Sequence, residues 1–173
     1  MTSIETRLAA VEAELRRQQD HGAIIQLIAS YGPLVDTSDR LERSHNLATL
    51  WTEDGICDIG GVGAFHGREA IAELFADGHF DQVPEGVCHI MGLPFISLAG
   101  DEAVALNYTC VMRHDGNGGF YPWRVSANRW ELVRQEGRWL VQQRTNRLMT
   151  GNPDTLAMLA SIDGMAGALP GAT

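Results

Sequence analysis

Three polar residues stand at positions where the surrounding pattern predicts an apolar face. Tyr31 and Asp36 come at the end of an apolar helical stretch, and His89 lies in the strand-like run Val-Cys-His-Ile-Met. Because side chains alternate along a strand, His89 shares its face with Val87 and Met91. A carboxylate that is hydrogen-bonded to an imidazole fixes the tautomer of the ring and makes it a better base, and a phenol can donate a proton. Together the three residues therefore predict general acid–base chemistry.

Each of these residues also has a simpler interpretation when it is taken alone. His89 can be a hydrogen-bonded core residue, and Tyr31 a core aromatic whose hydroxyl bonds to the backbone. Asp36 can cap the helix that follows, a task for which Asp39 is an alternative. The catalytic interpretation therefore requires that all three side chains meet in one cavity.

The first third of the chain is predicted to be helical and has to position Tyr31 and Asp36. Residues 3–19 predict a helix with Ser3 as a possible N-cap, and Asp20 is the expected cap of a second helix. Gly32-Pro33 is expected to disturb that second helix, because proline lacks a backbone N–H. A third amphipathic stretch is expected from residue 39 to residue 51.

Beyond residue 52 the apolar pattern becomes typical of strands. A short helix is expected from residue 67 to residue 75, and the expected strands cover residues 55–59, 87–98, 103–113, 121–134 and 138–149. Turn-forming residues separate the expected strands, as in Gln135-Glu136-Gly137. Helices followed by a curved antiparallel meander predict one α+β domain over residues 1–150, with the helices on one face of the sheet. Residues 151–173 predict a tail with a loosely attached helix and a frayed end.

An ordered set of short motifs carries a family resemblance: Tyr31-x4-Asp36-x2-Asp39, Leu50-Trp51-Thr52-Glu53-Asp54, Gly67-Arg68-Glu69-Ala70-Ile71, His89-x4-Pro94 and Gly137-Arg138-Trp139. Over residues 4–150 the chain resembles SnoaL-like proteins of the nuclear-transport-factor-2-like superfamily. Within it, the chain is similar to bile-acid 7α-dehydratases and, more distantly, to scytalone dehydratase. The resemblance implies a cone-shaped α+β barrel in which a curved antiparallel or mixed sheet wraps around the N-terminal helices and leaves a deep pocket. It also implies that Tyr31, Asp36 and His89 match the dehydratase Tyr, Asp and His.

The chain departs from the dehydratase pattern at the remaining pocket positions. A further carboxylate of that pattern falls at Met112, which cannot ionise, and the late arginine has two candidates, Arg144 and Arg147. Asn107 and Asn128 could line the pocket as donors or face solvent. The substrate-binding residues that we expect from the sequence are Trp51, Asn107, Asn128 and Arg144.

These residues predict a cofactor-independent lyase or isomerase that acts on a hydrophobic ring compound such as a steroid or a polyketide. Proton abstraction by the Asp36–His89 pair would be the first step, and Tyr31 would donate a proton to the leaving group. One alternative is a non-catalytic module of the same fold that binds a small molecule or serves as a small subunit. A further alternative is an epoxide hydrolase. We expect no cofactor and no metal ion, because the histidines and cysteines lack ligand spacing.

Composition excludes several other classes of function. The chain has 173 residues with 22 Asp and Glu against 13 basic residues, all of them arginine, and a net charge of −9. The charge disfavours nucleic acid or an anionic membrane as a partner, and the absence of lysine excludes Schiff-base chemistry. The three dispersed cysteines indicate reduced, buried thiols rather than disulfides. With no export signal and no apolar run long enough to span a membrane, we expect a cytoplasmic protein.

An oligomer is also expected. Ile4, Leu8, Val11 and Leu15 form a narrow apolar seam on the first helix, which can pack over its own domain or clamp a second copy. Trp123 and Trp130 are an odd number of residues apart, so alternation predicts them on opposite sides of one strand. The resemblance implies a homodimer or homotrimer formed through the sheet.

Overall fold

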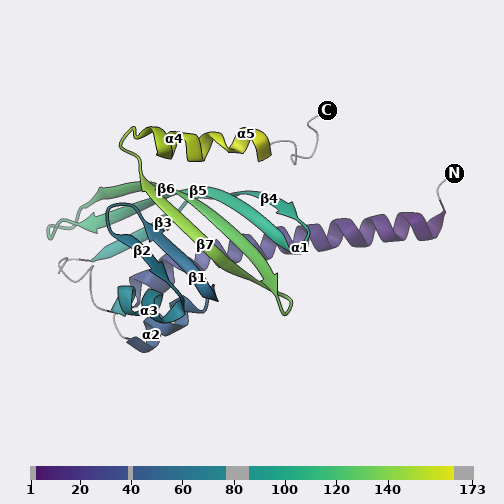
Figure 1. Ribbon diagram of the computed structural model, residues 1–173. Coiled ribbons are helices and arrows are strands. Elements are labelled where there is room, and N and C mark those ends of the chain that lie inside the picture. The colour runs from purple at the N-terminus through teal and green to yellow at the C-terminus, as the bar shows by residue number, and fades with distance from the viewer. Residues whose placement is uncertain (1–2, 39–40, 77–85, 166–173) are drawn as a thin grey trace.

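The longest element of the molecule is a single helix, α1, which spans Ile4–Asp36. The computed structural model describes residues 3–38, 41–76 and 86–165 (Figure 1). Ser3 is the predicted N-cap, and its hydroxyl accepts a hydrogen bond from the Thr6 N–H at 3.2 Å. The predicted boundary at Asp20 and the break at Gly32-Pro33 are wrong, because α1 is continuous through both. Pro33 lies in the final turn, where it removes only one helical hydrogen bond.

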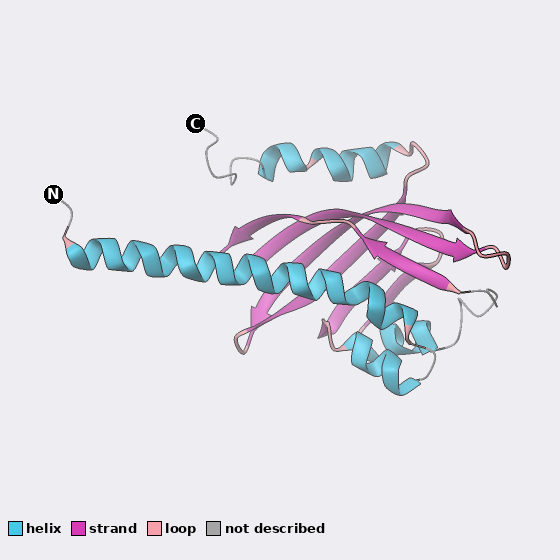
Figure 2. Ribbon diagram, turned by 180° about the vertical axis from the view of Figure 1, so that it is seen from behind, coloured by secondary structure: helices cyan, strands magenta, loops and turns pink. Residues whose placement is uncertain are grey.

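The described residues form one curved sheet of seven strands. The strands are β1 Trp51–Ile59, β2 Gly63–His66, β3 Val87–Met91, β4 Phe95–Ala99, β5 Glu102–His114, β6 Phe120–Gln135 and β7 Arg138–Leu148. Their spatial order is β2-β1-β7-β6-β5-β3, with β4 also paired to β5, and only the β1–β7 pair is parallel. The sheet does not close into a barrel, but the predicted α+β architecture is confirmed (Figure 2).

Three local predictions along the sheet need correction. The expected strand over residues 87–98 is divided into β3 and β4, because residues 92–94 between them are not in strand conformation and include Pro94, which has no N–H to donate. Trp51 does not end the third helix but begins β1. The short strand β2 was not among the expected strands, and it pairs with β1 as a hairpin.

The turn between β6 and β7 shows why the hairpin prediction succeeds. Glu136 and Gly137 are its central residues, and their φ angles are +50° and +77°. Two successive positive φ angles match the right-handed twist of the flanking strands, and glycine adopts the second of them without steric cost. The turn therefore sets the register in which Gln135 pairs with Arg138.

Asp20 attaches the middle of α1 to this hairpin instead of capping a helix. Its carboxylate accepts hydrogen bonds from Trp139 Nε1 at 3.1 Å and from Arg134 Nη2 at 2.5 Å. Partial burial acts to raise the pKa of Asp20, but the hydrogen bonds from Arg134 and Trp139 outweigh it and the net shift is downward. A carboxyl whose pKa is lower in the folded state stabilises the fold above its unfolded pKa, and this stability is lost as the pH falls through the folded pKa.

We therefore expect Asp20→Asn to lower the free energy of unfolding at neutral pH by about 1 kcal/mol. The variant should also lose less stability than the wild type between about pH 5 and pH 2, since it no longer has this carboxyl to protonate. Urea unfolding at the two ends of that range measures both effects. An unchanged acid sensitivity would contradict the assignment.

The concave face of the sheet holds the core. The second half of α1 presents Ile24, Ile28, Tyr31 and Val35 to it, all of them buried. Helices α2, Leu41–Ala48, and α3, Arg68–Ala76, pack on each other beside the end of α1. Asp39, the alternative helix cap, lies outside the described residues.

The N-terminal half of α1 projects beyond the sheet (Figures 1 and 2). Its seam of Ile4, Leu8, Val11 and Leu15 is 56–82% exposed, so the alternative in which it packs over its own domain is wrong for the single chain. The oligomer stays a prediction. The tail contains helices α4, Pro153–Ala160, and α5, Ile162–Met165, as far as the structure describes it.

Two further sequence predictions concern membrane-spanning helices and the state of the cysteines. No described helix combines the length and the apolar character that crossing a bilayer requires. The cysteines are unbridged, but only Cys57 is buried, whereas Cys110 is half-buried and Cys88 is exposed. Cys88 is an outward position of the edge strand β3, which explains why the expectation of three buried thiols fails.

Candidate active site

Asp36 and His89 lie in direct contact. The Asp36 carboxylate accepts two hydrogen bonds from His89, one from the backbone N–H at 2.9 Å and one from the ring Nδ1 at 2.6 Å. The side chains of His89 and Asp36 are 7% and 20% exposed. Assigning the proton to Nδ1, which donates to the carboxylate, gives Nε2 the lone pair. The contact predicted between the acid and the imidazole is therefore confirmed.

Gly32 makes this contact possible. A Cβ atom at Gly32 would lie 2.5 Å from the backbone oxygen of His89, so only glycine allows α1 to lie this close to β3. Asp36 follows one helical turn later on the same face of α1. The close approach of the two backbones therefore brings the Asp36 carboxylate to the backbone and ring of His89.

His89 lines a cavity of about 130 Å³ between α1 and the concave face of the sheet. Aliphatic and aromatic side chains make up much of the wall, with polar groups at a few points. The lining residues are Tyr31, Ile59, Val62, Leu74, His89, Thr109, Val111, Trp123, Arg124, Ser126, Arg144 and Asn146. Such a wall limits the water that competes with a base for a proton.

Tyr31 is buried at the centre of the aromatic packing. Its ring meets those of Trp130, Trp51, Phe75 and His89 edge to face at 5.5–6.4 Å between centroids. Its hydroxyl oxygen accepts a hydrogen bond from Arg144 Nη1 at 2.6 Å. Burial raises the pKa of Tyr31 well above its usual value, although the Arg144 guanidinium opposes this shift. The phenol therefore stays protonated and can donate its own hydrogen.

Arg144 is buried, and hydrogen bonds and aromatic contacts fix its position. It is 3% exposed, and its Nε and Nη2 both donate to Asn128 Oδ1, at 3.2 and 2.9 Å. Its guanidinium carbon lies 4.3 Å from the centroid of the Tyr31 ring and 5.0 Å from that of Trp130. The neutral side chains of Asn128 and Trp130 thus orient this cation toward Tyr31.

Comparison with known proteins identifies the family of the chain. The model of the SnoaL-like domain matches residues 16–145. The chain belongs to the SnoaL-like domain family. An NTF2-like protein with a cystatin-like fold from Novosphingobium aromaticivorans is 36% identical, with a TM-score of 0.80, and the match covers 88% of this chain and 96% of that one. No protein with a curated description matches the sequence.

More distant solved structures share the fold. A type 2 hexachlorocyclohexane dehydrochlorinase, LinA, is 17% identical, with a TM-score of 0.66 and coverage of 79% of this chain and 89% of that one. ActVI-ORFA from Streptomyces coelicolor is 20% identical, with a TM-score of 0.64 and coverage of 74% and 96%. At these identities the likeness concerns the fold only.

Three of the seven predicted site residues line the cavity, and a fourth is bound to one of them. Tyr31, His89 and Arg144 line it, and Asp36 binds His89. Of the two candidates for the late arginine, Arg147 instead donates to Asp58 at 2.6 Å.

The other predicted substrate-binding residues lie outside the lining of this cavity. Trp51 is fully buried against Tyr31, and its Nε1 donates to the backbone oxygen of Ile56. Asn107 accepts a hydrogen bond from Trp130 Nε1 and donates to the oxygen of Gly92, and Asn128 supports Arg144. These three residues do not line this cavity, because their polar atoms hold the sheet and the arginine in place. That they contact substrate stays a prediction.

Arg124, Asn146 and Trp123 also line the cavity, and we did not expect them there from the sequence. Arg124 has the same parity along β6 as Ser126, Asn128 and Trp130, and this signal could have found it. Trp123 could not be found in this way. The pairing changes from Val111 with Arg124 to Met112 with Pro122, and the bulge turns Trp123 toward the cavity, so the predicted opposite placement of Trp123 and Trp130 is wrong.

Among the residues that the structure describes, no three His, Cys, Asp or Glu side chains gather as metal ligands.

Proposed function

We propose that this SnoaL-like protein is a cofactor-independent lyase or isomerase that removes a proton from a carbon next to a carbonyl group. The observation that carries the proposal is the contact of 2.6 Å between Asp36 and His89 Nδ1 beside a largely apolar cavity. A carboxylate on Nδ1 raises the basicity of Nε2 and stabilises the imidazolium that forms. General-base catalysis of this kind contributes a factor of about 10²–10⁴ to the rate.

The proposed reaction starts when His89 Nε2 takes the proton and the carbonyl becomes an enolate. In this proposal Tyr31 is not the proton donor to the leaving group that we expected from the sequence. Its hydroxyl instead donates a hydrogen bond to the enolate oxygen, and the Arg144 guanidinium stabilises the negative charge through the 2.6 Å bond to Tyr31. In an isomerisation the His89 imidazolium returns its proton to a second carbon of the same conjugated system. In an elimination the electron pair instead expels a leaving group from the neighbouring carbon, and the imidazolium gives its proton to solvent.

The volume of the cavity limits the size of the substrate. A cavity of about 130 Å³ is comparable to the ~150 Å³ cavity that holds benzene in another protein. We therefore propose a substrate that inserts one ring beside His89, smaller than the steroid or polyketide that we expected from the sequence. No Asp or Glu is among the lining residues described, so no specific observation favours the epoxide hydrolase.

The experiment is the conversion of cyclohex-3-en-1-one into cyclohex-2-en-1-one, which needs only proton abstraction and return. We expect the purified chain to accelerate it without any added cofactor. We also expect phenol, which resembles the planar enolate, to bind more tightly than cyclohexanone. Equal binding of the two probes without acceleration would instead support the non-catalytic binding module.

A further inference from the structure

Two guanidinium groups line the same cavity, and neither has a described acidic partner. Arg144 and Arg124 come from neighbouring strands, β7 and β6. Within residues 3–38, 41–76 and 86–165, neither forms an ion pair with Asp or Glu. The whole protein carries a net charge of −9, so this concentration of positive charge is a local feature that its overall composition does not explain.

Neutral groups hold both arginines without neutralising them. Arg124 Nη2 donates to the backbone oxygen of Gly60 at 2.6 Å and to Asn146 Oδ1 at 3.1 Å. The Asn146 amide in turn donates to Asn128 Oδ1 at 2.8 Å, the same atom that accepts from Arg144. One amide network therefore orients both guanidiniums and leaves their charge available to a ligand.

The two arginines differ in what they can still bind. Arg144 uses Nε, Nη1 and Nη2 on Asn128 and Tyr31. Arg124 uses only Nη2, and no described acceptor binds its Nε or Nη1. Arg124 is also the half-buried one of the pair. Its unused N–H groups therefore suit the planar, two-oxygen geometry of a carboxylate.

The two charges also act against each other. Burial lowers the pKa of Arg124, and the positive charge of Arg144 lowers it further. Buried like charges are unfavourable unless a counter-charge compensates them. An anion that enters the cavity would relieve this repulsion, whereas a neutral ligand would not.

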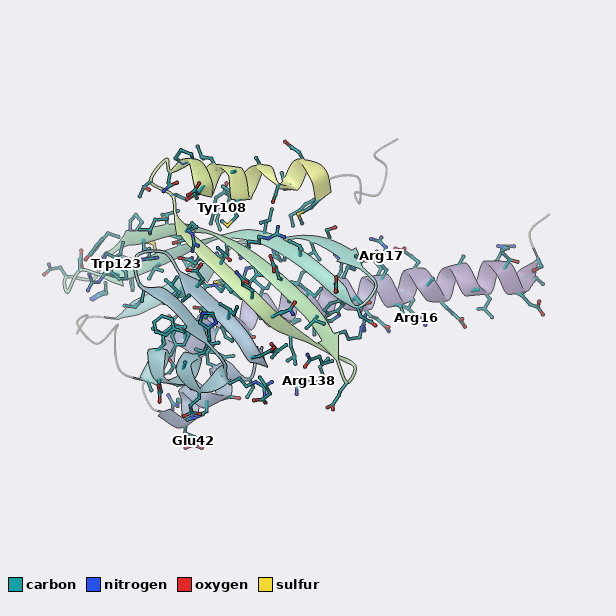
Figure 3. All side chains as sticks on the ribbon, in the orientation of Figure 1. Arg16, Arg17, Glu42, Tyr108, Trp123 and Arg138 are labelled. Atoms are coloured by element: carbon teal, nitrogen blue, oxygen red, sulfur yellow. The ribbon has the colours of Figure 1, made fainter. Side chains whose placement is uncertain are left out.

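We propose that the substrate of this cavity is a ring compound that carries a carboxylate group, which Arg124 binds while the ring packs against Ile59, Val62 and Trp123. The inference rests on the proposed function only in taking this cavity as the substrate site. Trp123 is 42% exposed, and the guanidinium carbon of Arg113 lies 4.6 Å from the centroid of its indole ring. Figure 3 shows Trp123 at the end of the sheet away from the projecting half of α1. A further positive charge therefore stands beside the cavity lining.

Binding of benzoate and benzamide tests the proposal, because the two have nearly the same shape and differ in charge. By isothermal titration calorimetry we expect the wild type to prefer benzoate by roughly tenfold to a hundredfold. Arg124→Gln should lose most of this preference, and Arg124→Lys should keep part of it. Arg129→Gln removes an equal charge from the same strand at a side chain that pairs with Glu131, and it should change nothing.

Several results would overturn the proposal. They are equal binding of benzamide and benzoate by the wild type, no binding of benzoate at millimolar concentration, or an unchanged preference in Arg124→Gln. Acetate that binds as tightly as benzoate would show a site for small anions without recognition of a ring, and would also overturn it. His89→Ala separates the two proposals. A benzoate preference that persists in this variant supports the Arg124 site even if the wild type isomerises no ketone.

Discussion

Replacing His89 by alanine is expected to lower kcat/KM for the isomerisation of cyclohex-3-en-1-one by about 10²–10⁴-fold. The variant loses the ring nitrogen that takes the proton, whereas the cavity wall keeps its apolar side chains. Asp36→Asn should cause a loss within the same range, since an amide no longer stabilises the imidazolium or favours the Nδ1–H tautomer. The two losses should not add in the double variant, because both residues act through one proton-accepting nitrogen. Ultraviolet absorbance of the conjugated product measures all of these rates.

The control for this prediction is His66→Ala, which removes an exposed histidine from β2. It should isomerise the ketone at the wild-type rate. Circular dichroism and thermal unfolding show whether His89→Ala remains folded. A folded His89→Ala variant that retains wild-type turnover would remove the base from the proposed reaction.

The second large effect is expected at Gly32, which touches no substrate. Gly32→Ala would place its methyl group 2.5 Å from the backbone oxygen of His89. Neither backbone can yield as a flexible side chain does, so α1 and β3 have to separate. We expect a loss of about 1–3 kcal/mol in the free energy of unfolding, although alanine favours a helix over glycine by about 1 kcal/mol. Separation also lengthens both hydrogen bonds to Asp36, and displacement of catalytic groups by about 1 Å can cost about 10²-fold in rate.

Gly22 provides the matched control on the same helix. A Cβ atom there meets nothing within 4 Å. Gly22→Ala is therefore expected to stabilise the protein by up to about 1 kcal/mol and to leave turnover unchanged. Urea unfolding and the isomerisation assay compare the two variants directly. If Gly32→Ala behaves like Gly22→Ala, the close approach of α1 and β3 does not position His89.

The ionisable residues in and beside the cavity include two pairs that the expected reaction uses differently. Asp36 and His89 form a pair in which one carboxylate orients one base. On the neighbouring strands β6 and β7, Arg124 and Arg144 share an amide network and have no described acidic partner. A negative charge that develops on a substrate thus meets cations whose positions neutral partners already determine, which is the arrangement that electrostatic stabilisation requires.

Local patterns predicted much of this fold. The strands β5, β6 and β7 lie within one residue of their predicted bounds, because alternation and turn chemistry act over a few neighbouring residues. The prediction of two separate helices in place of α1 rested on equally local patterns, and it is wrong. Asp20 is a good N-cap by type, but its carboxylate binds Trp139 and Arg134, which lie more than a hundred residues away in the chain. A long-range contact of this kind overrides a local preference.

The sequence alone determined the α+β architecture and the residue types for acid–base chemistry at Tyr31, Asp36 and His89. Only the tertiary structure decided which polar residues reach the cavity. Arg144 lines it, whereas Arg147 pairs with Asp58. The amides of Asn107 and Asn128 instead form hydrogen bonds with other residues of the sheet. The physical reason is that residue type and spacing specify periodicity and turns. Access to a cavity depends instead on strand register, on the bulge at Trp123, and on a close approach of backbones that Gly32 alone permits.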